Sequence, residues 1–164
     1  MKTEPSSALS DFARLAAAFC AWCESGALGA TPERIISRWL AQLYAAGLLL
    51  AEVEAEKQAP EIPASDTSAG ETAIRPLLGY YYREIFDPHP NFNEEPCVGD
   101  VGDDLLDVYR DIKRGMKLYE LGFPRAAEWE WAFSFRVHWG RHATGALAAL
   151  HGLVHSNLAG ENAA

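Results

Sequence analysis

The chain has 164 residues, a length typical of one domain, and its 49% hydrophobic and 23% charged residues are typical of a globular protein. Its 14 basic and 23 acidic residues give a formal net charge of −9, which argues against nucleic acid as a partner because phosphate binding needs a basic surface. No stretch is apolar enough to span a membrane, and the N-terminus lacks the order of a signal peptide, so we expect a cytoplasmic protein.

Residues 1–50 predict an N-terminal pair of helices. Apolar residues recur at helical spacing from about Ser7 to Glu24, and Gly26 follows the end of this run. Thr31 and Pro32 then supply an N-cap and a first helical residue, which predicts the start of a second helix.

The three cysteines are an odd number and too few for a disulfide framework. Cys20 and Cys23 match the C-x-x-C pattern of redox proteins, but they lie near the end of an apolar helical run with no strand pattern before it. We therefore interpret this pair as core residues.

Residues 51–71 are acidic, contain two prolines and no aromatic residue, and predict a flexible linker or long loop. They separate the N-terminal pair from a C-terminal helical unit, residues 72–157, and we expect one domain overall. Within this unit a third helix is predicted over residues 72–86, with Pro76 in its opening turns and the hydroxyls of Tyr80, Tyr81 and Tyr82 on several of its sides.

Residues 87–96 form a loop rich in proline and in side-chain oxygens, which are the ligands that calcium prefers. The spacing of Asp87, Asn91, Asn93 and Glu95 does not follow the D-x-[DN]-x-[DN]-G pattern, and prolines occupy positions where a calcium loop must turn tightly. We therefore expect no calcium site here.

Two long helices close the chain. The fourth starts near Asp100, with Asp103 placed as in a capping box, and ends before Gly122. Pro124 starts the fifth helix, which is apolar on most sides and is therefore predicted to be central; its large residues are Trp129, Trp131, Phe133, Phe135, Val137 and Trp139. The predicted fold is an all-α antiparallel bundle of about five helices, with a long central C-terminal helix.

The short turn between the last two helices predicts that they pack antiparallel, which sets which residues lie level. Asp107 is then level with His138, and Asp104 is level with Arg141 and His142. Asp111 shares one edge of its helix with the other two aspartates, and the two histidines are four residues apart.

Carboxylates and imidazoles that meet across a helix pair can hold a divalent metal, act as an acid–base pair, or only fix the helix register. We favour register pairing, because the E-x-x-H and H-E-x-x-H motifs are absent. His151 and His155 are also four apart but lie nearly opposite the first pair on the helical wheel. The candidate ligand-binding residues are Asp104, Asp107, Asp111, Glu130, His138, Arg141 and His142.

Four aromatic-rich blocks resemble a known family. They are YYREIFDP at residues 81–88, GDDLLDVYRD at 102–111, WEWAFSF at 129–135 and HWGRH at 138–142. The content and order of these blocks resemble those of a bacterial family called domain of unknown function 5063, and the resemblance covers residues 72–152. The resemblance implies a bacterial source and a helical fold, and it implies no substrate or active site.

These observations favour a non-enzymatic protein-interaction module whose partner is a protein. No catalytic signature is present, and no cofactor is predicted. The alternative is a metal- or small-ligand-binding domain with hydrolytic activity at the Asp/His seam of the last two helices. A homodimer is a further alternative, because large apolar residues are spread around the fifth helix at Trp129, Phe133 and Trp139.

Overall fold

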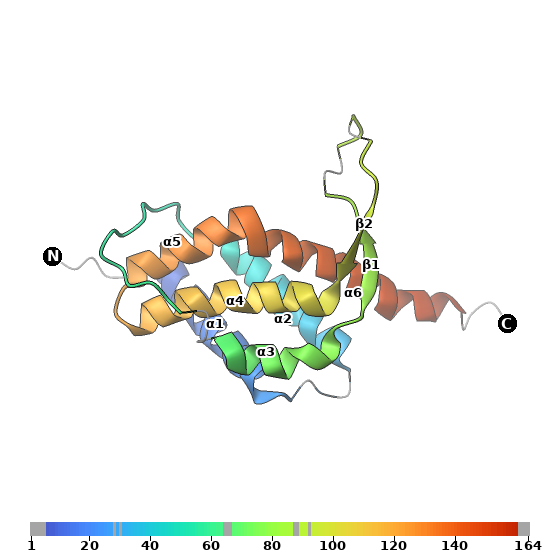
Figure 1. Ribbon diagram of the computed structural model, residues 1–164, viewed down its shortest axis with the longest axis horizontal. Helices are drawn as coiled ribbons and strands as arrows, with labels where there is room; N and C mark the ends of the chain where they lie inside the picture. The colour runs from blue at the N-terminus through green and yellow to red at the C-terminus, as the bar shows by residue number, and fades with distance from the viewer. Residues whose placement is uncertain are drawn as a thin grey trace.

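The computed structural model describes residues 6–27, 29, 31–63, 67–86, 89–91 and 93–160, with backbone alone for residues 156–160. Helices dominate it, and they lie side by side in a bundle (Figure 1). The predicted helical bundle with a long C-terminal helix is confirmed.

Both N-terminal helices begin where the sequence predicted, and the first also ends as predicted, whereas the second ends before Leu50. The first helix, α1, spans Ser7–Ser25; the Ser6 hydroxyl accepts a hydrogen bond from the Leu9 amide (3.1 Å) at its start, and Gly26 ends it in the left-handed region (φ 67°). The second, α2, spans Pro32–Gly47. Cys20 and Cys23 are buried in the core and free, and burial raises the pKa of Cys20 to about 12, which keeps its thiol protonated.

The predicted helix over residues 72–86 is wrong. A short helix, α3, spans Ser68–Ile74, and a 3₁₀ turn, η2, covers Arg75–Leu77. Gly79 then takes a left-handed conformation (φ 105°), which ends helical structure. The chain continues into a strand, β1 (Tyr81–Glu84), which pairs antiparallel with β2 (Cys97–Asp100). Aromatic residues favour strands, so the tyrosine run fits a hairpin better than a helix.

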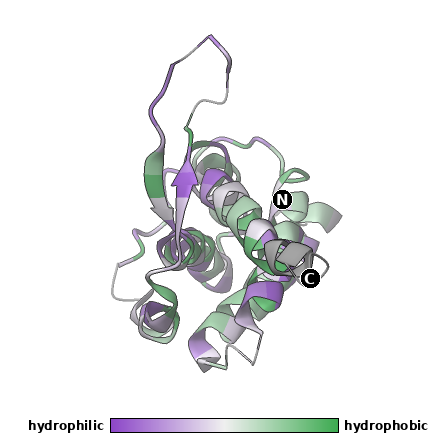
Figure 2. Ribbon diagram, turned by 90° about the vertical axis from the view of Figure 1, so that its right-hand side faces the viewer, coloured by the Kyte–Doolittle hydropathy of each residue, from purple (hydrophilic) through white to green (hydrophobic). Residues whose placement is uncertain are grey.

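The strands of this hairpin lie beside the helices, and the hairpin projects beyond the bundle (Figure 2). Tyr82 pairs with Gly99, and Tyr81 pairs with Asp100. In the loop beyond, Asp87 lies outside the described residues, so the sequence argument about calcium is not tested there.

The last two predicted helices are present. Helix α4 spans Val101–Glu120, and the Asp100 side chain caps it by accepting from the Gly102 amide (2.8 Å). Helix α5 spans Pro124–Ser134, a π-helical turn, η3, covers Phe135–Trp139, and α6 continues over Gly140–Gly160. The π turn was not predicted, because the predicted fifth helix continues with regular helical spacing through residues 135–139.

All six α-helices contribute buried residues, and α1, α5 and the π turn meet at a cluster of aromatic rings. The rings of Phe12 and Trp131 lie 4.9 Å apart, and Trp131 and Trp139 are fully buried. Phe133 and Val137, in contrast, are exposed, so the C-terminal helix is less enclosed than its composition predicted. Within the described residues, no helix combines the length and apolarity that a bilayer requires.

Candidate metal centre

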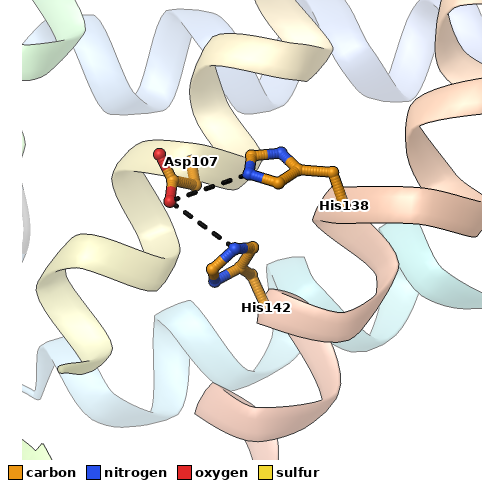
Figure 3. Close-up of side chains that lie close together, drawn as sticks. All are labelled: Asp107, His138 and His142. Atoms are coloured by element: carbon orange, nitrogen blue, oxygen red, sulfur yellow. Dashed lines mark ion pairs between the residues drawn. The ribbon is translucent and has the colours of Figure 1, made fainter. Parts of the chain in front are cut away.

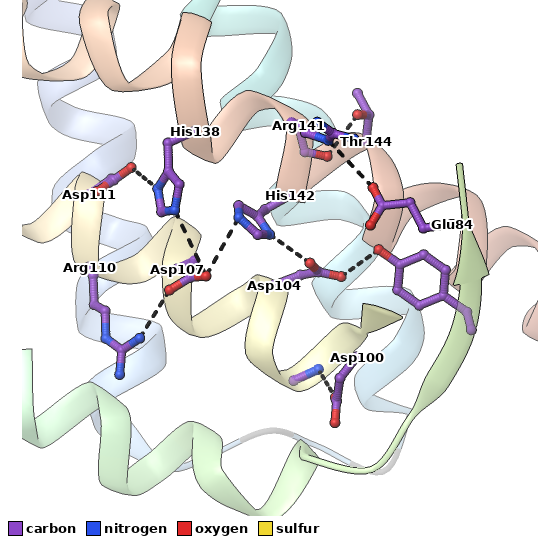
Figure 4. Close-up of polar contacts among 12 residues, drawn as sticks. Glu84, Asp100, Asp104, Asp107, Arg110, Asp111, His138, Arg141, His142 and Thr144 are labelled. Carbon is purple, nitrogen blue, oxygen red and sulfur yellow. Dashed lines mark hydrogen bonds and ion pairs between the residues drawn. The ribbon is translucent and has the colours of Figure 1, made fainter. Parts of the chain in front are cut away.

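A row of alternating acidic and imidazole side chains lies along the seam between α4 and α6 (Figure 4). The carboxylates of Asp104, Asp107 and Asp111 extend from successive turns of α4. The imidazoles of His138, at the end of the π turn, and His142, in the first turn of α6, lie between them. The level positions expected of an antiparallel helix pair are therefore present.

Each imidazole is held through its Nδ1 atom by a buried carboxylate. His142 Nδ1 lies 2.8 Å from Asp104 Oδ1, and His138 Nδ1 lies 2.7 Å from Asp111 Oδ2. An ionised carboxylate only accepts hydrogen bonds, so each Nδ1 carries the hydrogen. The lone pair of each neutral imidazole is then on Nε2.

Both Nε2 atoms approach the same oxygen (Figure 3). Asp107 Oδ2 lies 3.6 Å from His142 Nε2 and 4.0 Å from His138 Nε2. One ligand atom from each of these three residues falls within 4.8 Å of the others. The two imidazoles and the carboxylate therefore surround one point.

Burial differs between the two kinds of residue in this row. Asp104 and Asp111 are only 5% and 8% exposed, whereas the side chain of His138 is 45% exposed. The hydrogen bond with Asp104 raises the pKa of His142, against the opposing effect of burial. The outer carboxylates are thus buried, and of the three residues that converge only His138 is exposed, whereas the side chains of His142 and Asp107 are 27% and 20% exposed.

Arg110 binds the other carboxylate oxygen of Asp107. Its guanidinium donates to Asp107 Oδ1 (3.0 Å) and to Glu71 Oε1 on α3 (3.0 Å). The hydrogen bond from Arg110 lowers the pKa of Glu71, so the pair is ionic. Arg110 fixes the orientation of the Asp107 carboxylate and leaves Oδ2 facing the imidazoles.

The π turn places His138 beside Asp111. A Cβ atom on Gly140 would lie 2.4 Å from the Phe135 carbonyl oxygen, so glycine permits the close approach of backbone at this turn. Helical segments of this kind occur frequently at functional sites.

Tyr82 extends the row into the hairpin. Its hydroxyl donates to Asp104 Oδ2 (2.8 Å). A Cβ atom on Gly99 or on Gly145 would lie 2.5 Å from the Tyr82 side chain, so two glycines provide the space that this ring fills. Asp104 is therefore held by a strand as well as by its histidine.

Two of the seven candidate residues lie apart from the row. Glu130 pairs with Arg114 (3.4 Å), and burial raises the pKa of Glu130. Arg141 pairs with Glu84 (3.7 Å) and covers the Phe86 ring at 3.6 Å from its centroid. The structure thus brings together Asp104, Asp107, Asp111, His138 and His142.

The list of candidate residues omitted Tyr82 and Arg110, although Arg110 belongs to the GDDLLDVYRD block that carries the family resemblance. The spacing of Arg110 from Asp107 is a helical i,i+3 spacing, so Arg110 could have been found. Tyr82 was not a candidate because residues 72–86 were predicted to be helical. The strand preference of the tyrosine run was the one signal that it belongs to a hairpin.

The sequence profile of a protein family called domain of unknown function 5063 (DUF5063) matches residues 3–156. The chain belongs to the DUF5063 family. The match extends beyond residues 72–152, to which the sequence resemblance was limited, and includes the N-terminal helices. No curated protein matches this DUF5063 chain.

The fold of this DUF5063 protein is similar to the crystal structure of protein BF1032 from Bacteroides fragilis, with a TM-score of 0.72. The two are 22% identical, over 90% of this chain and 92% of the other. At that identity the likeness concerns the fold.

Proposed function

We propose that this domain binds one divalent transition-metal ion through Asp107, His138 and His142. The observation that carries the proposal is the convergence of two Nε2 atoms on one carboxylate oxygen. Pairing that only fixes helix register needs one contact for each histidine, and the Nδ1 contacts with Asp104 and Asp111 already supply it.

The donor set supports this proposal. Two imidazoles and one carboxylate bind zinc and non-haem iron in many proteins. Two ligand atoms on a tetrahedral zinc lie roughly 3.3 Å apart, so the separations of 3.6 and 4.0 Å from Asp107 Oδ2, within a set that spans up to 4.8 Å, must shorten by side-chain movement when a metal binds. Carboxylates on the Nδ1 side of metal-binding histidines are the common supporting arrangement, because they orient the ring and increase its basicity.

Three protein ligands leave coordination positions for water or for a substrate. A metal in such a position lowers the pKa of bound water and produces a nucleophile near neutral pH. The half-exposed His138 faces solvent at this point. We therefore propose hydrolysis as the reaction class to screen once a metal is found.

The test is metal analysis by plasma mass spectrometry of the purified protein after loading with zinc or iron and removal of excess ions. We expect about one metal per chain in the wild type and loss of it in the His138→Ala, His142→Ala variant.

The matched control is a His151→Ala, His155→Ala variant, which removes another pair of histidines four residues apart, further along α6. This control should keep its metal. Loss of metal in the control, with retention in the His138/His142 variant, would show that the metal binds adventitiously to exposed histidines and would end the proposal.

A second candidate function is protein interaction, and it is supported by a different observation. The rings of Trp129 and Phe133 stack at 5.0 Å with their planes 6° apart, and Phe133 and, one turn further on, Val137 are exposed. Exposed apolar patches mark interaction surfaces. We propose self-association here, which light scattering would detect as a dimer that a Phe133→Ser, Val137→Ser variant cannot form; a monomeric wild type would contradict it.

A further inference from the structure

A second group of ionisable side chains lies in a groove between α2 and α6. The groove has a volume of about 590 Å³. Small-molecule sites typically measure 300–1,000 Å³, so this groove has room for a small organic molecule. Asp107, His138 and His142 are not among the residues that line it.

The polar residues of the groove are cationic or neutral. Arg34 and Arg38, one turn apart on α2, line the groove opposite His151 and His155 of α6, and Ser37 of α2 also lines it. Of the described residues, those that line the groove include no aspartate or glutamate. In a chain with a net charge of −9, four such side chains together form a local site for an anion.

The two arginines are available to a ligand. Both are exposed, and no ion pair or hydrogen bond among the described residues engages either guanidinium group. Other arginines of the chain do pair with acids, such as Arg110 with Glu71 and Arg136 with Glu52. Unpaired guanidinium groups at adjacent turns can each donate two hydrogen bonds to a phosphate.

The wall of the groove is apolar. Leu147, Leu150 and Val154 line it from α6, and Leu150 is 1% exposed. An inorganic ion would leave this surface in water, whereas a ligand with a hydrocarbon portion would cover it. The groove therefore combines an anion-binding rim with an apolar surface.

We propose that this groove binds a small amphiphilic phosphate monoester. The phosphate contacts Arg34, Arg38 and the two histidines, and the hydrocarbon portion lies along Leu147 and Val154. Phosphate is favoured over carboxylate because its three oxygens match two arginines on adjacent turns. This site is independent of the metal proposal, since it shares no residue with Asp107, His138 and His142.

The test is calorimetric titration of the full chain with octyl phosphate below its micelle concentration, in the presence of a chelator so that no metal contributes. We expect saturable binding, with inorganic phosphate and the uncharged octyl glucoside each at least about tenfold weaker. An Arg34→Gln, Arg38→Gln variant should lose at least about tenfold in affinity. An Arg136→Gln variant, altered at an exposed arginine outside the groove, should bind as the wild type does.

A Val154→Asp variant places a negative charge on the half-buried apolar wall and should weaken octyl phosphate more than inorganic phosphate. Equal affinity of wild type and the double arginine variant, or equal affinity for inorganic phosphate and octyl phosphate, would overturn the proposal. Binding to vesicles that contain phosphatidic acid, with none to free octyl phosphate, would also overturn it and would assign the groove to a membrane lipid.

Discussion

Asp104 and Asp111 contact the histidines of the proposed metal site and are not among its three proposed ligands, so any effect they have on a bound metal is transmitted through the imidazoles. Their burial fixes the ring orientations that direct both Nε2 atoms to Asp107. A change at either aspartate should therefore alter metal affinity while leaving every proposed ligand in place.

We expect an Asp104→Asn variant to bind zinc about 10–100-fold more weakly than the wild type, because the neutral amide no longer supports the basicity and orientation of His142. Competition titration with a zinc-sensitive dye measures this. Asp103→Asn is the control, since Asp103 is exposed on the same turn of α4. Unchanged zinc affinity in Asp104→Asn would show that this carboxylate only fixes helix register.

Two glycines of α6 allow a matched test of the space around Tyr82. A Cβ atom on Gly145 would meet the Tyr82 hydroxyl at 2.5 Å, whereas one on Gly152 would meet nothing within 4 Å. We expect Gly145→Ala to lower the free energy of unfolding by about 1–3 kcal/mol, because Tyr82 must move and Asp104 loses its hydrogen bond. Gly152→Ala should raise it by up to about 1 kcal/mol through helix propensity. Urea unfolding measures the free energy of unfolding of both variants. Equal changes in Gly145→Ala and Gly152→Ala would contradict the close packing of Gly145 against Tyr82.

At the scale of elements, the helices with clear end signals were predictable. Thr31-Pro32 and Pro124 mark helix starts, and Gly26 marks an end, because these residues act on the backbone locally. The hairpin was not predictable in the same way. Tyr82 pairs with Gly99, which is far from it in the chain, and the sequence between the two strands contains no short turn motif that would indicate a hairpin.

One contact between elements gives a pH dependence. Glu24 on α1 pairs with Lys113 (2.5 Å) and accepts from the Tyr109 hydroxyl (2.8 Å) on α4. Burial tends to raise the pKa of Glu24, but the hydrogen bonds from Lys113 and Tyr109 outweigh it and lower this pKa. The ionised carboxylate therefore stabilises the fold above its ordinary pKa of 4.5, and this contribution is lost as the pH falls through the lowered folded pKa.

We expect Glu24→Gln to lower the free energy of unfolding by about 1 kcal/mol at neutral pH, and the difference from wild type to shrink as the pH falls below 4.5. Denaturant unfolding over this pH range measures the difference. Glu54→Gln, at an exposed position, should have little effect at any pH. A difference that stays constant with pH would show that the Glu24 contacts do not depend on its charge.

On the scale of the whole molecule, the N-terminal helices pack on the same core as the candidate centre. Phe12 of α1 is fully buried between Trp131 (4.9 Å) and Trp139 (6.2 Å), and α2 packs along α6. The division at residues 51–71 that composition suggested therefore does not interrupt the hydrophobic cluster.

We expect a fragment of residues 64–164 to lack a cooperative unfolding transition, because removal of α1 and α2 exposes the rings of Trp131 and Trp139. Near-ultraviolet circular dichroism and binding of a hydrophobic dye would detect the loss of fixed packing. A sharp thermal transition in the fragment would show that the C-terminal unit folds alone.

The gathering of five candidate side chains was predictable because they lie on neighbouring helices joined by a short turn. What could not be predicted was which atoms would meet. The Nδ1 contacts of His138 and His142 depend on the π turn, and the position of Tyr82 depends on the hairpin. A helical wheel assumes regular α-helical spacing, so it represents neither of them.

The π turn also affects how sequences of this family should be aligned. An extra residue in a turn leaves the flanking helices in line but shifts the sequence by about 100° of helical rotation on either side of it. A relative whose helix runs as α throughout would therefore need a one-residue gap within residues 135–139. Without that gap, an alignment would match the residues of one helix face with those of another and would displace His138 from the residue that occupies its place in the relative.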